Sequence, residues 1–112
     1  MEITIYEKAL CCETGVCGPG VDTELLRITA AVRNIRKNGV EIRRYNLSMH
    51  PEKFMTDPLL TEALEKEGVD CLPVTITKDG IVKRKDYPTN EELALWSGLD
   101  LAKIRENQLL TF

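Results

Sequence analysis

Three of the four cysteines in the chain lie close together near its start. Cys11, Cys12 and Cys17 share residues 9–20 with three glycines and a proline, a composition typical of a loop. Three thiolates on one loop suit a soft, thiophilic ion that takes three ligands, and trivalent arsenic and antimony fit this description. A lone free cysteine is often a small core residue, but that explanation suits three cysteines in a glycine-rich loop poorly.

Two other chemistries remain open for this cluster. A structural zinc site needs four ligands, and His50 or Cys71 could each supply one from elsewhere in the chain. A redox disulfide could join Cys11 or Cys12 to Cys17. The Cys-x-x-Cys spacing of thiol oxidoreductases is absent, and a bridge between adjacent cysteines is sterically awkward. The loop also precedes a predicted helix, whose positive end lowers the pKa of a nearby thiol.

Cys71 and His50 are expected to have structural roles. Cys71 precedes a predicted core strand, so we expect it to be buried by packing. His50 precedes Pro51 in a polar turn, so we expect an exposed loop or capping residue there. The candidate ligands are therefore Cys11, Cys12 and Cys17.

The elements that position the cysteine loop follow from the apolar pattern. Alternation at Ile3 and Ile5 predicts a strand. Residues 21–35 carry apolar side chains at helical spacing, which predicts a helix that ends at Asn38-Gly39. A second strand is expected over residues 40–45. A helix follows the Asp57 N-cap and ends at Gly68, with its apolar side formed by Leu59, Leu60, Ala63 and Leu64.

The second half of the chain predicts a hairpin and further helices. A third strand over residues 74–77 and a fourth over 81–83 flank Asp79-Gly80, which suits a tight turn. Thr89 and Glu92 form a capping-box pattern that begins a helix over residues 90–96. A last short helix is expected after Asp100.

The element order β-α-β-α-β-β-α predicts an α/β fold in one domain, residues 1–112. Its first three elements require a parallel strand pair, and the hairpin adds an antiparallel strand. We therefore expect a four-stranded mixed β-sheet flanked by helices, an order that resembles the thioredoxin fold. In that fold a proline before the third strand is often cis and faces the first loop, and Pro73 is at the matching place.

Composition narrows the functional classes. The formal net charge of -3 disfavours a strongly basic nucleic-acid binder. The acidic, alternating start is not a signal peptide, and no apolar run could span a bilayer, which favours the cytoplasm, where thiols stay reduced. Two basic groupings are more typical of solvated surface than of a docking patch: Arg33, Arg36, Lys37, Arg43 and Arg44, and Lys83, Arg84 and Lys85.

With these motifs together, the chain resembles the ArsD family of arsenical-resistance operons. The resemblance rests on Cys11-Cys12 and Cys17-Gly18, followed by Val21-Asp22 and an amphipathic helix. It extends over the later segments Arg44-Tyr45-Asn46-Leu47, Leu72-Pro73-Val74, Asp79-Gly80, Tyr87-Pro88-Thr89 and Glu92-Leu93-Ala94-Leu95-Trp96.

The resemblance implies a metallochaperone that is not an enzyme. It implies that Cys11, Cys12 and Cys17 bind As(III) or Sb(III) and pass it by stepwise thiolate exchange to ArsA, the ATPase of the arsenite efflux pump. It also implies a homodimer that acts as a weak, metalloid-responsive transcriptional repressor on operator DNA, with no required cofactor. The alternatives are a thioredoxin-like thiol oxidoreductase and a zinc-binding interaction module.

Overall fold

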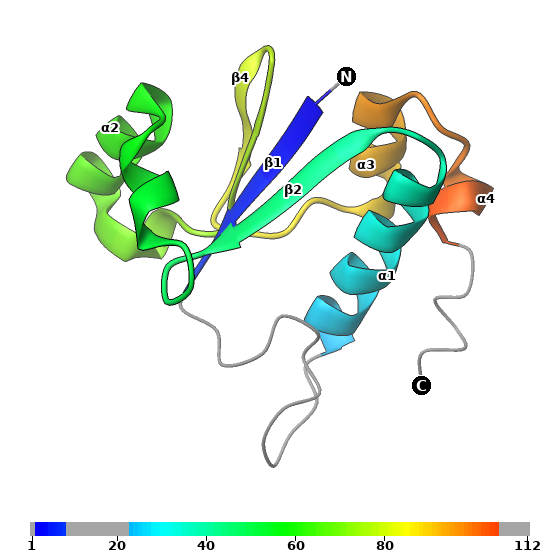
Figure 1. The fold of residues 1–112 in the computed structure, drawn as a ribbon, viewed down its shortest axis with the longest axis horizontal. Coiled ribbons are helices and arrows are strands. Elements are labelled where there is room, and N and C mark those ends of the chain that lie inside the picture. The colour runs from blue at the N-terminus through cyan, green and yellow to red at the C-terminus, as the bar shows by residue number, and fades with distance from the viewer. Residues whose placement is uncertain (1, 9–22, 106–112) are drawn as a thin grey trace.

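The structure is a computed structural model that describes residues 2–8 and 23–105. The described elements follow the predicted order (Figure 1). The predicted start of the first helix at Val21 lies outside the described residues. The elements are β1 (Glu2–Glu7), α1 (Thr23–Lys37), β2 (Glu41–Asn46), the 3-10 helix η1 (Pro51–Met55), α2 (Pro58–Glu67), the 3-10 helix η2 (Gly68–Cys71), β3 (Val74–Thr77), β4 (Gly80–Arg84), α3 (Asn90–Ser97) and α4 (Leu101–Ile104).

The four strands form one mixed sheet in the order β2-β1-β3-β4. Strands β1 and β2 are parallel, with Ile3 opposite Ile42. Strand β3 runs antiparallel to β1, with Val74 opposite Tyr6, and β4 is antiparallel to β3. This arrangement confirms the predicted mixed, four-stranded α/β sheet with its thioredoxin-like order.

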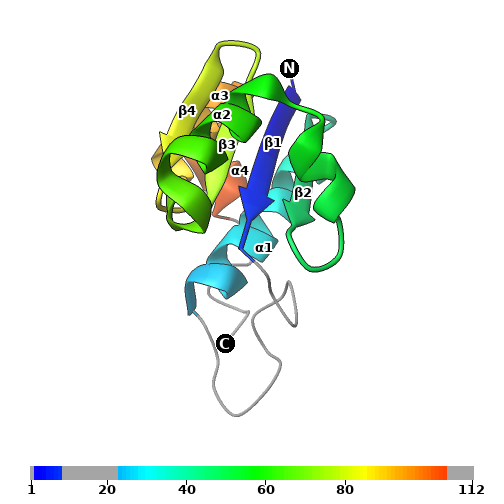
Figure 2. The ribbon, with the colours of Figure 1, turned by 90° about the vertical axis from the view of Figure 1, so that its left-hand side faces the viewer.

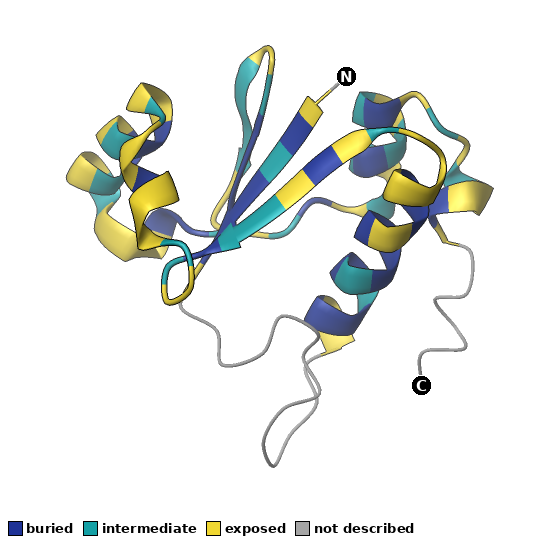
Figure 3. Ribbon diagram, in the orientation of Figure 1, coloured by how far each residue is buried: buried dark blue, intermediate teal, exposed yellow. Residues whose placement is uncertain are grey.

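Helices cover both faces of the sheet (Figures 1 and 2). Helices α1, α3 and α4 lie on one side, where Ile3 and Ile5 pack against Ile28 and Leu93. Because side chains alternate along a strand, Tyr6 points to the other face and packs with residues of η1 and α2. The sheet thus separates two hydrophobic cores, and the inward sides of the helices are buried (Figure 3).

Helix α2 differs from the prediction at one apolar position. Leu60 and Ala63 are buried, but Leu59 is 44% exposed. At 100° per residue, Leu60, Ala63 and Leu64 share one side of the helix and Leu59 lies at its margin. The apolar side of α2 is therefore narrower than predicted.

Local capping signals act as predicted. Asp57 accepts a hydrogen bond from the Leu59 backbone N–H at 2.9 Å. Thr89 and Glu92 form a complete capping box at the start of α3, and Gly98 ends that helix with φ +75°. No helix within residues 2–8 and 23–105 is long and apolar enough to cross a membrane.

Candidate functional site

The predicted ligands Cys11, Cys12 and Cys17 lie outside the described residues. The structure describes the two elements that flank them: β1, which ends at Glu7, and α1, which begins at Thr23. Both of these points lie in the lower part of Figure 2. Covalent geometry alone keeps Cys11 within about 14 Å of Glu7, since one residue spans at most about 3.6 Å. The surroundings of Glu7 are therefore close along the chain to these cysteines.

A buried ion pair lies at the end of β1. Arg44 of β2 donates from Nε to Glu7 Oε2 at 2.8 Å and from Nη2 to Glu7 Oε1 at 2.7 Å. The side chains of Arg44 and Glu7 are 6% and 0% exposed. A buried charge is tolerated only when it is paired and hydrogen-bonded, and the two parallel contacts meet that requirement.

Two further side chains complete this cluster. The Tyr87 hydroxyl, from the segment between β4 and α3, donates a hydrogen bond to Glu7 Oε1. Arg44 also donates from Nη1 to the Thr29 hydroxyl of α1 at 3.0 Å. Burial, and then the negative charge of Glu7, raise the pKa of Tyr87, so its hydroxyl stays protonated as a donor. The cluster thus ties two strands, α1 and the segment before α3 together.

The Leu72–Pro73 peptide bond lies next to this cluster. It is cis, as a proline at this place in a thioredoxin-like fold often is. Val74 pairs with Tyr6, so the antiparallel register places Pro73 level with Glu7 at the end of β1. The prediction that Pro73 faces the cysteine loop stays a prediction, because that loop lies outside the described residues.

Cys71 is a core residue, as predicted. Its thiol is free and its side chain is completely buried. Burial, and then the nearby charge of Glu67, raise the pKa of Cys71, which disfavours the thiolate that a metal or metalloid needs. In the part of the chain that the structure describes, no group of three or more His, Cys, Asp and Glu side chains could hold a metal ion.

His50 differs from its predicted role. It occupies the N-cap position of η1, but its side chain makes no capping hydrogen bond. Its ring instead packs edge-on against Tyr45, with 5.3 Å between ring centroids, and the residue is half-buried. His50 is therefore an aromatic packing residue rather than an exposed loop or capping residue.

The first predicted basic grouping does not form one face. Arg43 and Arg44 are neighbours in β2, so their side chains leave the sheet on opposite sides. Arg43 pairs with Glu2 and Glu41 at the surface, whereas Arg44 is buried with Glu7.

The second grouping is paired with carboxylates. Lys83 contacts Glu92 at 3.1 Å. Arg84 and Lys85 contact the two carboxylate oxygens of Glu67, at 2.9 and 3.1 Å. Two carboxylates thus pair with these three cations, because Arg84 and Lys85 share Glu67.

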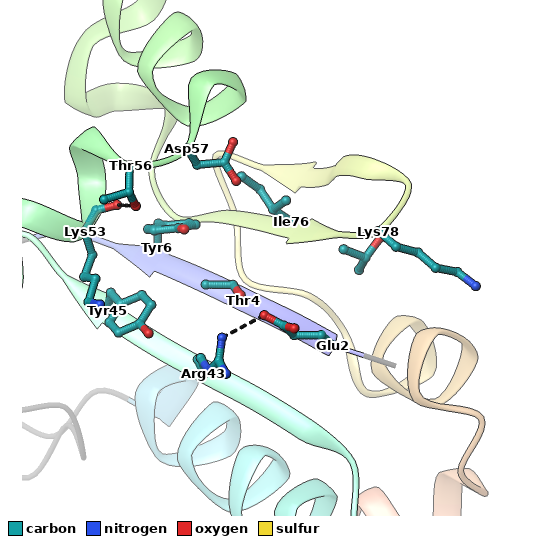
Figure 4. A pocket seen from close by; sticks show the side chains of 11 residues that line it. Glu2, Thr4, Tyr6, Arg43, Tyr45, Lys53, Thr56, Asp57, Ile76 and Lys78 are labelled. Atoms are coloured by element: carbon teal, nitrogen blue, oxygen red, sulfur yellow. Dashed lines mark hydrogen bonds and ion pairs between the residues drawn. The ribbon is translucent and has the colours of Figure 1, made fainter.

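A groove of about 410 Å³ lies on the α2 side of the sheet (Figure 4). Its floor includes Thr4 and Tyr6 of β1 with Tyr45 of β2, and Lys53 and Asp57 form part of its wall. The ammonium of Lys53 lies 5.5 Å from the centre of the Tyr45 ring. This mixed polar lining contains no cysteine, so the groove does not extend the predicted sulfur site.

The cluster around Glu7 was not predicted, although the sequence held a signal for it. Ile3, Ile5 and Glu7 share one face of β1 by alternation, which places a carboxylate at a core position. A buried carboxylate requires a cation, and Arg44 in the neighbouring strand provides it.

Comparison with known proteins gives consistent matches. The model of the family described as "Arsenical resistance operon protein ArsD" matches residues 1–110. Two Escherichia coli proteins named "Arsenical resistance operon trans-acting repressor ArsD" are 37% and 33% identical over 102 residues, covering 91% of this chain and 85% of each relative. The crystal structure titled "Arsenical Resistance Operon Trans-acting Repressor" from Bacteroides vulgatus ATCC 8482 has a TM-score of 0.83 and 32% identity, covering 88% of this chain and 93% of that one.

Proposed function

The chain belongs to the ArsD family of arsenical resistance operon proteins, and from this we propose two linked roles. It acts as a trans-acting repressor of an arsenical resistance operon, and it carries As(III) or Sb(III) to the ATPase ArsA. Residues 1–112 act as one domain in a homodimer that works in the cytoplasm, needs no cofactor and is not an enzyme.

One observation carries the metalloid-binding role: three cysteines lie within residues 11–17 of an ArsD-family chain. The fourth cysteine is buried with a raised pKa, so it does not compete as a ligand. Three thiolates match the coordination that As(III) and Sb(III) take with sulfur, whereas zinc would require a fourth ligand. We therefore assign the metalloid to Cys11, Cys12 and Cys17.

Transfer to ArsA proceeds by thiol exchange without any change in oxidation state. A cysteine of the partner loses its proton and forms a bond to the metalloid, while one bond from the metalloid to this chain breaks. The released thiolate takes up a proton, so the number of metalloid–sulfur bonds is conserved. Repetition moves the metalloid without releasing it into solution.

X-ray absorption spectroscopy of the arsenite-loaded protein tests the ligand set. We expect one arsenic with three sulfur neighbours per chain. Single Cys11→Ser, Cys12→Ser and Cys17→Ser variants should lose one sulfur each, and the matched Cys71→Ser control should retain all three. Three-sulfur coordination that is retained in any one of the Cys11, Cys12 or Cys17 variants would refute the assignment, unless adding Cys71→Ser to that variant removes it and so shows that Cys71 substitutes.

The alternative of a thiol oxidoreductase is supported by the strand order of the sheet. A disulfide-reductase assay separates the two functions. Catalytic turnover that depends on Cys12 would replace the metallochaperone role. Stimulation of ArsA by the arsenite-loaded protein, lost on Cys12→Ser, would support it.

A further inference from the structure

The groove on the α2 side of the sheet is a candidate site that the metalloid-binding role does not use. Its volume is about 410 Å³, and its lining comes from β1, β2, β3 and the segment from η1 to the start of α2 (Figure 4). Pockets of this size hold small molecules. Which small molecule the groove fits depends on the chemistry of its floor and walls.

Two tyrosine rings lie in the floor of the groove. Tyr6 and Tyr45, from neighbouring strands, have ring centroids 5.8 Å apart and an interplanar angle of 41°. Tyr6 is only 6% exposed, and its ring also packs edge-on against Phe54. The core thus holds an aromatic surface in place at the floor, which suits a ligand with an apolar or aromatic part.

The hydroxyl of Tyr6 lies within reach of the charges that line the groove. Burial raises the pKa of Tyr6 most, and the Asp57 carboxylate raises it next. Tyr45 and Glu2 raise it further, whereas Arg43 lowers it. All four of these neighbours line the groove. Because its pKa is raised, the hydroxyl stays protonated and is a hydrogen-bond donor for a ligand.

A lysine ammonium lies beside this floor. Lys53 of η1 is exposed, and its Nζ lies 5.5 Å from the centre of the Tyr45 ring. The negative face of an aromatic ring attracts a cation, so this contact favours a position of the ammonium next to the floor. Its three N–H donors suit a carboxylate of a bound ligand.

Asp57 contributes the opposite charge from another part of the wall. Its Oδ1 accepts a hydrogen bond from the Leu59 N–H at 2.9 Å, as the N-cap of α2. A carboxylate has about four acceptor sites on its two oxygens, so the cap leaves room for a donor from a ligand. In Figure 4, Tyr6 lies between Asp57 and Lys53. The two opposite charges are therefore separated by the aromatic floor.

The remaining charges of the lining are arranged differently. Glu2 and Arg43 pair with each other at 2.8 Å, so their charges compensate each other. The side chain of Lys78 points away from the groove in Figure 4. Lys53 and Asp57 are thus the two charges that a ligand on the tyrosine floor meets.

We propose that this groove binds a small zwitterion, a free amino acid or dipeptide that carries both a carboxylate and an ammonium. The carboxylate accepts from the Lys53 ammonium and the Tyr6 hydroxyl, and the ammonium donates to Asp57. A simple anion or a simple cation fits less well, because each would meet one like charge. Such binding goes beyond the metalloid and repressor roles and does not depend on them.

Titration of the full chain with the dipeptide glycylphenylalanine, followed by NMR of the backbone amides, tests the proposal. We expect saturable shifts at Thr4, Tyr6 and Tyr45. The N-acetyl derivative of the dipeptide lacks the ammonium, and its C-terminal amide lacks the carboxylate. Each derivative should bind about tenfold more weakly, which corresponds to the loss of one charge-assisted contact.

Two variants assign the charged ends of the ligand. Lys53→Met should weaken binding of the dipeptide about tenfold and leave the Kd of the amide unchanged, because the amide has no carboxylate. Asp57→Asn keeps a good N-cap, and should weaken the dipeptide but not the N-acetyl derivative. The matched controls Lys103→Met and Asp70→Asn change exposed residues outside the groove and should bind as the wild type does.

Several results would overturn the proposal. The dipeptide could produce no saturable shifts, or either derivative could bind as tightly as the dipeptide itself. A Lys53→Met variant that weakens the amide as much as the dipeptide would show an effect of packing rather than charge. The urea midpoint of each variant establishes that it is folded. A variant with Cys11, Cys12 and Cys17 changed to serine should keep the wild-type Kd, because the groove lining contains no cysteine.

Discussion

The side chains of Arg43 and Arg44 leave β2 on opposite faces of the sheet, and each forms an ion pair with a carboxylate from β1. Arg44 pairs with Glu7 in the interior, where the two side chains are 6% and 0% exposed. Arg43 pairs with Glu2 at the surface, where they are 44% and 53% exposed. Two adjacent residues of one type thus make the same contact in different surroundings.

The two ion pairs should differ in their contribution to stability. Arg44→Met leaves the Glu7 carboxylate buried without a cation and should lower the free energy of unfolding by about 3–5 kcal/mol. The matched Arg43→Met variant should change it by less than about 1 kcal/mol, because the exposed pair is screened by water. Urea unfolding of both variants measures the difference.

A double variant keeps this prediction testable if Arg44→Met is too unstable to purify. Removing both charges with Glu7→Leu and Arg44→Met should be less damaging than removing Arg44 alone, because no unpaired charge remains. Equal losses for Arg43→Met and Arg44→Met would contradict the structure of this cluster.

Tyr87→Phe should destabilise the protein in a pH-dependent way. It removes a hydrogen bond to the charged Glu7, worth about 1.5–3 kcal/mol near neutral pH. The pKa of Tyr87 is raised in the folded protein, so its contribution is fully present below the unfolded value of about 10 and is lost as pH rises above it.

The measurement is the free energy of unfolding of the wild type and of Tyr87→Phe, at pH values below and above about 10. The wild type should lose more stability than the variant across this interval. Parallel losses in the two proteins would show that Tyr87 does not titrate differently on folding.

Cys71 should be unreactive in the native protein. In a variant with Cys11, Cys12 and Cys17 all changed to serine, Cys71 is the remaining thiol, and burial both shields it and raises its pKa. A colorimetric disulfide reagent should detect no rapidly reacting thiol in this variant until it is unfolded. Fast labelling under native conditions would be inconsistent with the buried position.

Thr89→Ala should weaken the start of α3. The Thr89 hydroxyl accepts from the Glu92 backbone N–H at 3.1 Å, and the Glu92 carboxylate accepts from the Thr89 N–H at 2.9 Å. We expect a loss of about 1 kcal/mol in urea unfolding. The exposed Thr56→Ala control should lose less than about 0.5 kcal/mol. A smaller effect for Thr89 than for Thr56 would argue against the capping box.

Features with local causes could be predicted from the sequence. The capping box at Thr89, the Asp57 N-cap and the strand over residues 74–77 each depend on a few neighbouring residues, and the structure has all three. The parallel pairing of β1 with β2 followed from connection rules that do not depend on side-chain detail. The predicted core position of Cys71 followed from its place before an apolar strand.

Features with long-range causes could not be predicted from the sequence. Glu7 and Arg44 are 37 residues apart. Alternation in β1 places Glu7 on the core side, but nothing local identifies Arg44 as its partner. The packing of His50 on Tyr45 likewise depends on how η1 returns to the sheet. For the candidate site, residue type and spacing predict the sulfur ligands Cys11, Cys12 and Cys17, which lie outside the described residues.

The helices on the two sides of the sheet differ in charge: α1 contains four basic residues and one acidic residue, whereas residues 51–71 contain two basic and six acidic residues. This separation gives the molecule an electric dipole across its sheet. In the field of a nucleic acid or another polyanion, such a dipole turns the α1 layer forward before any contact is made. A negative net charge is then compatible with rapid encounter with a polyanion, because the orientation of the protein, rather than its total charge, determines the local attraction. The same separation makes that encounter rate fall as ionic strength rises.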